Sequence, residues 1–205
     1  MNKRGKFIVF EGIDGSGKST QLKILAERMR EKGIACHETL EPTYGLVGGI
    51  LHDILSKKIK ADPKVTAGLF VTDRLDHLLN ENDGVVKTLN EGITVLCDRY
   101  YFSSYAYQGS EVPLGWVIDA NSLCADVLRA DYTIFIDVSP EVAMERINQN
   151  RGETELFENV DKLTAVRNGY MKAFEMMKDK ENIIIINGNQ SMEDVAREVE
   201  KVVLG

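Results

Sequence analysis

Three glycines, a lysine and three hydroxyl residues are gathered in the stretch FEGIDGSGKST, residues 10–20. Gly12, Gly17, Lys18 and Ser19 fit the spacing G-x-x-x-x-G-K-S/T, which is typical of a loop that binds nucleoside triphosphate. Glycines let the backbone curl so that its N–H groups point at phosphate oxygens. The lysine would reach the β- and γ-phosphates, and the serine hydroxyl suits Mg²⁺. The predicted phosphate-binding residues are Gly12, Gly15, Ser16, Gly17, Lys18, Ser19 and Thr20.

A second polar pair, Asp98 and Arg99, directly follows the apolar run 93–97. A carboxylate at the C-terminal end of a buried parallel strand is where such folds hold Mg²⁺, so Ser19 and Asp98 are the expected metal ligands. The planar guanidinium of Arg99 suits two phosphate oxygens, although an ion pair at the strand end is the plain structural alternative. The aromatic cluster that follows, at residues 100–107, could form either core or a pocket for a base.

A phosphate-binding loop of this kind leaves three classes of protein open. A GTPase switch needs an N-K-x-D stretch to read guanine, and the sequence contains none. A motor-type ATPase usually works in an array, which this short acidic chain does not indicate. A kinase acting on a small molecule needs a second site for the phosphate acceptor and a lid that carries arginines. An acceptor site and an arginine-bearing lid would therefore distinguish a kinase from the other two classes.

The composition sets limits on partners and location. The chain has 205 residues, 43% of them hydrophobic, and a net charge of −7. This length suffices for one domain spanning 1–205, and the acidic balance argues against general affinity for nucleic acid or acidic membranes. The apolar runs are too short for a transmembrane helix or a signal peptide. Cys36, Cys97 and Cys124 form no C-x-x-C pair, which indicates reduced thiols and a cytoplasmic location.

The elements that must position these residues alternate along the chain. Short β-branched or aromatic runs predict strands at 7–10, 35–40, 93–97, 132–136 and 183–186. Helical stretches lie between them, at 18–32, 46–55, 65–80, 85–90, 114–128, 141–149, 160–178 and 193–203. Ser139 before Pro140, and Ser191 with Asp194, are typical helix starts. The pattern predicts an α/β fold of the P-loop type, with about five parallel strands and helices on both faces.

Longer stretches resemble one known family. The segment DRYYFSSYAYQG, residues 98–109, closely resembles the D-R-Y/H-x-x-S-x-x-A-Y/F-Q-G stretch of thymidylate kinases. The opening FEGIDGSGKST is similar to that family's P-loop, and LFVTDRLDHL to its helix with phenylalanine and, four residues later, arginine. Further similar stretches are EPTYG and the region from 135 to 170. The resemblance covers residues 7 to about 203. It implies phosphoryl transfer from ATP to dTMP, and a related deoxynucleoside or nucleoside monophosphate kinase is the alternative.

The resemblance implies roles for residues around the base. Phe70 would stack on the thymine ring, Arg74 would donate to a base carbonyl, and Gln108 would pair with the N3–H edge. Phe70 and Arg74 lie one helical turn apart on the same face. The plain structural alternatives are a core aromatic for Phe70 and a salt bridge from Arg74 to Asp73 or Asp76.

The resemblance also implies contacts around the sugar and the acceptor phosphate. Arg99 would hold the phosphate, Asp14 would lie near the 3′-hydroxyl, and Tyr107 would lie under the sugar, where it would disfavour ribose. Two positions depart from the family. Leu40 stands where the family commonly has a phosphate-clamping arginine. Phe157 stands where many relatives have a tyrosine touching the sugar, so only its ring could pack there.

A catalytic arginine must come from outside the P-loop. Some family members carry an arginine after the acidic residue of that loop, whereas this chain has Gly15. The polar, glycine-containing segment at about 148–156 is the predicted lid, with Arg151 as the first candidate and Arg146 as the second. The resemblance also implies a homodimer and an adenine site near 187–190. His37, His52 and His77 lack cysteine or carboxylate partners at metal-ligand spacing, so structural or surface roles are expected for them.

Overall fold

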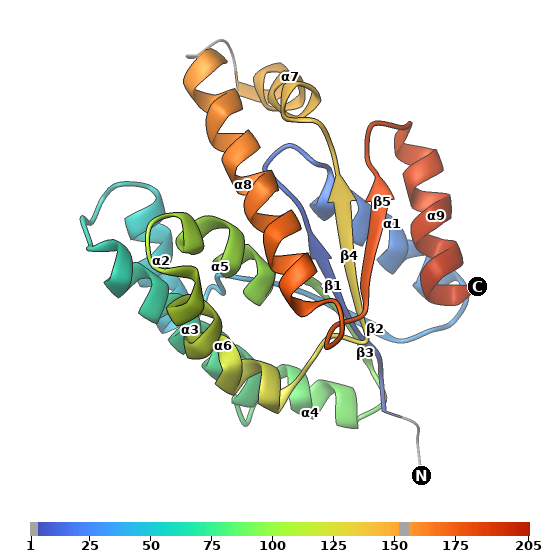
Figure 1. Cartoon of the computed structure of the whole chain (residues 1–205). Helices are drawn as coiled ribbons and strands as arrows, with labels where there is room; N and C mark the ends of the chain where they lie inside the picture. The colour runs from blue at the N-terminus through green and yellow to red at the C-terminus, as the bar shows by residue number, and fades with distance from the viewer. Residues whose placement is uncertain (1–3, 152–155) are drawn as a thin grey trace.

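The computed structural model describes residues 4–151 and 156–205, and the side chains of these residues apart from 150, 151 and 156–159. Figure 1 shows strands and helices alternating along this part of the chain. The strands are β1 (Phe7–Glu11), β2 (Cys36–Leu40), β3 (Thr94–Asp98), β4 (Tyr132–Asp137) and β5 (Ile183–Asn187). The helices are α1 (Lys18–Glu31), α2 (Leu46–Leu55), α3 (Pro63–Leu79), α4 (Val85–Asn90), α5 (Tyr101–Tyr107), η1 (Gln108–Ser110), α6 (Leu114–Val127), α7 (Pro140–Arg151), α8 (Leu156–Met177) and α9 (Met192–Leu204).

The described strands form one parallel sheet with the order β2-β3-β1-β4-β5. The central strands β1, β3 and β4 are buried along almost their whole length, which explains why their sequences are apolar without alternation. Helices α1 and α9 pack together on one face, and α3, α5, α6 and α8 lie on the other (Figure 1). The predicted α/β class, the five-stranded parallel sheet and the helices on both faces are confirmed.

The sheet order places the candidate site. The chain leaves β1 through α1 toward one edge of the sheet, and leaves β3 through α5 and α6 toward the other. Neighbouring parallel strands whose connections diverge open a crevice at their carboxyl ends, where ligands bind in such folds. In the register, Phe10 pairs with Asp98, so the P-loop after β1 and the Asp98-Arg99 pair at the end of β3 meet at this crevice.

Two helix starts follow the expected chemistry. The α7 helix begins at Pro140, and the backbone N–H of Val142 donates to the Ser139 hydroxyl at 3.4 Å. At α9, Ser191 accepts a hydrogen bond from the backbone N–H of Asp194 at 3.2 Å. Each hydroxyl satisfies an N–H group that the first helical turn leaves without a partner.

Two segments differ from the expectation. The aromatic stretch after Arg99 forms the helix α5, which the sequence analysis did not predict. Most of its side chains are buried, so it carries no polar face from which a helical period could be read. The predicted lid at about 148–156 is helical in its first part, because α7 extends to Arg151, and Leu156 already belongs to α8. The remaining lid residues, 152–155, lie outside the described residues.

Candidate active site

The P-loop follows β1 and closes tightly on its neighbours. Gly15 and Gly17 have φ angles of +80° and +91°, a region that side chains with a Cβ rarely adopt. A Cβ on Gly15 would come within 2.4 Å of the Ala143 carbonyl oxygen on α7. Position 15 therefore requires glycine both for the turn and for the close approach of α7. An arginine there would clash with α7 unless that helix moved.

Lys18 begins α1 and is buried under the loop, with only 8% of its surface exposed. Burial lowers the pKa of Lys18 to about 8, and the positive charge of Arg99 contributes to the shift, while the carboxylates of Asp98 and Asp14 oppose it. Burial deprives the Lys18 ammonium group of water. It is therefore suited to a strongly anionic ligand, because phosphate oxygens would replace the lost hydration.

Ser19 and Asp98, the predicted metal ligands, lie side by side. The Ser19 hydroxyl donates a hydrogen bond to Asp98 Oδ2. The other carboxylate oxygen, Oδ1, is buried and has no hydrogen-bond partner in the described part of the protein. A buried carboxylate oxygen without a partner is costly unless a ligand satisfies it. The hydroxyl and carboxylate oxygens are the donors that Mg²⁺ prefers, so these residues fit the ion.

Arg99 is held in a strained turn at the end of β3. It has a φ of +74°, unusual for a residue other than glycine. Its guanidinium donates to Asp14 at 2.5 Å and to the Ser103 hydroxyl at 3.1 Å, and it lies over the Tyr107 ring at 5.1 Å. Three residues that the resemblance placed around the acceptor sugar and phosphate, Asp14, Arg99 and Tyr107, are thus brought together. The ion pair expected as the plain alternative, between Asp98 and Arg99, is replaced by the pair with Asp14.

The charges of this cluster affect one another. Although partial burial would raise the pKa of Asp14, the positive charges of Arg99 and Lys18 hold it below its usual value. Burial raises the pKa of Tyr107 to about 12, so its hydroxyl remains protonated at neutral pH. The cluster therefore offers one carboxylate, two cations and a neutral phenol beside the P-loop.

Glu11, the last residue of β1, is a site residue that the sequence reasoning missed. Its carboxylate is fully buried and accepts hydrogen bonds from the Tyr100 backbone N–H at 2.8 Å, the Ser103 hydroxyl at 2.6 Å and the Tyr170 hydroxyl at 2.9 Å. Burial raises the pKa of Glu11 despite these bonds. Glu11 thereby fixes the turn that carries Arg99. A glutamate ending a buried strand was a visible signal, because acidic residues are rarely buried without a role.

The residues predicted around the base lie on α3 and η1. Phe70 and Gln108 are half-buried, on α3 and at the start of η1. Arg74 has only 1% of its surface exposed, and its Nε donates to Glu41 at 2.7 Å. The expected alternative partner Asp73 instead accepts two hydrogen bonds from Thr43. The salt bridge expected to Asp73 or Asp76 is therefore replaced by one to Glu41. The contacts of Phe70, Arg74 and Gln108 with a base stay predictions.

Arg146 is the candidate arginine whose side chain the structure describes. Its Nη1 donates to the Ser16 carbonyl at 3.2 Å and its Nη2 to the Gly188 carbonyl at 3.0 Å. Arg146 therefore links α7 to the P-loop and to the loop after β5, where adenine was predicted. Arg151 ends α7 and Phe157 lies in α8, but both side chains fall outside the described residues. Their predicted roles stay predictions.

Leu40 occupies the strand end where the family commonly has arginine. It is the last residue of β2 and pairs in register with Asp98 of β3, so it lies at the same edge as the cluster around Arg99. An apolar side chain at this place supplies no charge to an anion. Of these two neighbouring strand ends, the end of β3 supplies a cation to the cluster, Arg99, and Leu40 at the end of β2 supplies none.

Comparison with known proteins agrees with this geometry. The family model for thymidylate kinase matches residues 10–199. A protein of Pyrococcus horikoshii described as a probable thymidylate kinase is 35% identical over 98% of this chain and 96% of its own length. A thymidylate kinase of Caldicellulosiruptor saccharolyticus is 36% identical over the same shares of the two chains.

The chain belongs to the thymidylate kinase family. A putative thymidylate kinase of Treponema pallidum, 37% identical over 85% of this chain and 81% of its own length, agrees. Family membership confirms the predicted reaction, ATP-dependent phosphorylation of dTMP, and does not favour the alternative acceptors. Within the described residues, no helix has both the length and the apolar character needed to cross a membrane.

Proposed function

We propose that this kinase holds ATP on the P-loop and dTMP beside it, with Lys18 and Arg99 as the two cations that bring the phosphates together. The convergence of Lys18, Asp14 and Arg99 at the carboxyl ends of β1 and β3 supports this proposal, because both substrates are polyanions. Repulsion between substrates is the main obstacle to their approach, so positioning and neutralisation are the chemistry the site has to supply.

Each group then has a definite task. The P-loop amides and Lys18 bind the β- and γ-phosphates, and Arg99 aligns the acceptor phosphate in line with the transferred group. The acceptor oxygen is already ionised at neutral pH, so no strong general base is needed. Asp14 orients Arg99 through their 2.5 Å hydrogen bond and accepts from the sugar hydroxyl. Tyr107, packed against Arg99, forms the floor under the sugar.

Ser19 and Asp98 would hold Mg²⁺. The buried oxygen Oδ1 of Asp98, which has no hydrogen-bond partner among the described residues, supports the assignment. When bound, the ion supplies positive charge to the donor phosphates. The two residues come from α1 and β3, so the ion would also connect the P-loop to the strand end that carries Arg99.

A coupled assay of ADP release tests the function as a whole. Purified protein is given ATP with dTMP, dUMP, dCMP, dGMP or thymidine, one at a time. We expect dTMP to give the highest kcat/KM and thymidine to give no turnover above background, because Arg99 needs a phosphate. Turnover with thymidine but not dTMP would overturn the proposal.

The two candidate catalytic arginines should affect different kinetic constants when they are replaced. Arg151→Ala should lower kcat by about a hundredfold or more with little change in KM for dTMP, as expected for a contact made mainly in the transition state. Arg146→Ala should mainly raise KM for ATP, because Arg146 contacts the P-loop and the loop after β5. Steady-state kinetics with each substrate varied in turn separates the two effects.

The matched control for these variants is Arg197→Ala, which removes an exposed arginine on α9. It should leave both kcat and KM unchanged. If Arg151→Ala raised KM and left kcat intact, Arg151 would be a binding residue and the assignment of the catalytic arginine would be wrong.

We further propose that the chain is one kinase domain that forms a cytoplasmic homodimer. Apolar side chains are exposed along α3 and α6, which pack against each other (Figure 1): Val65, Trp116, Leu123 and Val127. A second copy covering this surface would remove them from water. The cysteines form no disulfide within the described residues, in keeping with a reducing compartment.

The dimer is tested by sedimentation velocity at micromolar concentration. We expect a species of two chains, and Leu123→Glu should convert it to single chains because a charge cannot be buried in an apolar contact. Met176→Glu, on the exposed surface of α8, is the matched control and should leave the dimer intact. A monomer in the unmodified protein would contradict the proposal.

A further inference from the structure

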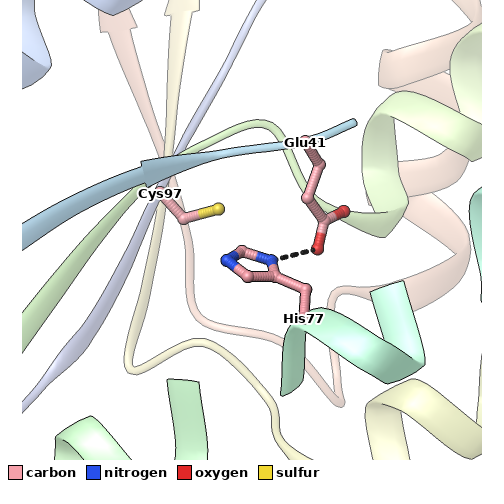
Figure 2. Close-up of side chains that lie close together, drawn as sticks. All are labelled: Glu41, His77 and Cys97. Atoms are coloured by element: carbon pink, nitrogen blue, oxygen red, sulfur yellow. Dashed lines mark hydrogen bonds and ion pairs between the residues drawn. The ribbon is translucent and has the colours of Figure 1, made fainter. Parts of the chain in front are cut away.

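A largely buried polar cluster lies next to Arg74, at the junction of β2, β3 and α3. Figure 2 shows the carboxylate of Glu41, the imidazole of His77 and the thiol of Cys97 close together, with the imidazole bonded to the carboxylate. The His77 Nδ1 lies 3.0 Å from Glu41 Oε1, and its Nε2 lies 2.8 Å from the Thr39 hydroxyl. A structural or surface role was expected for His77, and its contacts point to a more specific task.

The directions of these hydrogen bonds are fixed by chemistry. An ionised carboxylate can only accept, so Nδ1 of His77 carries a proton and donates to Glu41. The second oxygen of Glu41, Oε2, accepts from Arg74 Nε at 2.7 Å. One carboxylate thus accepts from two residues of α3, Arg74 and His77, which are spaced i and i+3 and lie on the same face of the helix. His77 therefore orients the carboxylate of Glu41, and that carboxylate in turn orients the guanidinium of Arg74.

Arg74 is fixed on its other side as well. Its Nη1 donates to the Ser104 hydroxyl at 3.2 Å and to the Asn121 side-chain carbonyl, and the guanidinium lies over the Tyr100 ring at 5.4 Å. These contacts come from α5, α6 and the turn after β3. Glu41 is the partner that carries negative charge, so it contributes most to the position of the guanidinium.

The same three side chains could be taken for a metal site, because glutamate, histidine and cysteine are all metal ligands. Their hydrogen bonds argue against this. The Cys97 thiol donates to the Arg99 carbonyl at 3.0 Å, both nitrogens of His77 are engaged, and Glu41 already faces the charge of Arg74. A cation there would have to break these contacts beside a buried guanidinium.

We propose that His77 is a positioning residue for recognition of the acceptor base: it holds Glu41, and Glu41 holds Arg74 at the angle needed to donate to the base carbonyl. This inference rests on the proposed function and on the role that the family resemblance implies for Arg74, donation to a carbonyl of the thymine ring. It makes a half-buried histidine that touches no substrate a determinant of which pyrimidine is phosphorylated. Thymine presents a 4-carbonyl where cytosine presents an amino group, so a well-held donor favours dTMP over dCMP.

Two substitutions at His77 test the proposal with the full-length protein. His77→Leu removes both hydrogen bonds while keeping an apolar side chain at the helix–sheet junction. His77→Asn keeps a side-chain N–H close to the position of Nδ1, so it can still donate to Glu41. We expect His77→Leu to lower kcat/KM for dTMP about tenfold through KM, with KM for ATP unchanged and dCMP turnover changed less than twofold. His77→Asn should restore most of the preference for dTMP.

A double-mutant comparison with Glu41 distinguishes the proposed role of His77 from a merely structural one. In a Glu41→Gln background, His77→Leu should cost less than twofold further in kcat/KM for dTMP, because its effect passes through that carboxylate. Thermal unfolding of each variant reports any loss of fold separately. If the double variant lost kcat/KM for dTMP by the full product of the two single losses, the residues would act independently and the inference would be overturned.

The remaining outcomes are also decisive. An unmodified protein that does not prefer dTMP to dCMP would contradict the proposed function. A preference for dTMP that His77→Leu leaves intact would contradict only the role of His77. Zn²⁺ added to the metal-free protein and measured after dialysis should not be retained at one ion per chain. Retention that is lost in His77→Asn would mean that the cluster is a metal site, and would overturn the inference.

Discussion

Lys18→Ala should lower kcat by about two to four decades and leave the protein folded. The loss follows from removal of a buried charge that faces the donor phosphates, where preorganised cations contribute most to the rate. The fold should survive because burial of this ammonium group is itself unfavourable, so a smaller uncharged side chain removes a cost. Turnover is measured by the coupled assay, and folding by circular dichroism and thermal unfolding.

Lys23→Ala is the matched control for this prediction. Lys23 lies on the same helix, α1, but its side chain is exposed. Its removal should change turnover less than twofold, which would show that the effect of Lys18 comes from its place in the P-loop. Near-normal turnover of the Lys18 variant would mean that the loop does not hold ATP as proposed.

The pH dependence of Lys18 gives a second, independent measurement. Because burial lowers its pKa to about 8, the free enzyme loses this charge as the pH rises through 8, and kcat/KM for ATP should fall there. Folding stability should change in the opposite direction. Between pH 8 and 10.5 the unfolded chain keeps a proton that the folded chain has released, so stability rises with pH in this window. Urea unfolding at pH 7 and pH 9.5 should show a rise in the unmodified protein that is absent from Lys18→Ala.

The fold could be predicted because its signals are local. Each buried strand is a short apolar run, and each helix between strands carries its own pattern or cap, as at Ser139 and Ser191. The P-loop could be recognised for the same reason, since its residues lie close together in the sequence between β1 and the start of α1. The α5 helix was not readable, because a helix buried on nearly all sides loses the polar face on which the helical period depends.

The contacts inside the site depend on pairs distant in the sequence, which one sequence cannot reveal. Arg74 pairs with Glu41, 33 positions away, and not with its neighbours Asp73 and Asp76. Arg99 likewise pairs with Asp14 across the gap between two strand ends. In both cases the sheet order brings the partners together, and that order follows from packing of the whole chain. Glu11 was visible as an acidic residue at the end of a buried strand, but its partners Tyr100, Ser103 and Tyr170 belong to the same class of distant contact.

Arg99→Ala should lower kcat/KM for dTMP by about two to three decades, the second large effect expected in this protein. Arg99 holds the acceptor phosphate, and Leu40, at the neighbouring strand end, has no charge to replace it. The substitution also leaves Asp14 without its nearest cation, so a negative charge would face the incoming phosphate. Arg99→Lys keeps the charge but loses the planar fork of the guanidinium. Its kcat/KM for dTMP should lie between those of the unmodified protein and Arg99→Ala. Kinetics with dTMP varied at saturating ATP measures all three proteins.

Leu40 offers a way to show that the loss is one of phosphate binding and not of folding. The family's arginine can be restored there, as Leu40→Arg, in the Arg99→Ala background. Since Leu40 and Asp98 are register partners at the edge of the sheet, the new guanidinium would start from the strand end next to the lost one. We expect it to recover about tenfold in kcat/KM, mainly through a lower KM for dTMP. Unchanged kinetics in Arg99→Ala would show that Arg99 does not hold the acceptor phosphate. Failure of Leu40→Arg to recover activity would show that the phosphate lies beyond the reach of β2, so that Arg99 works without help from that strand.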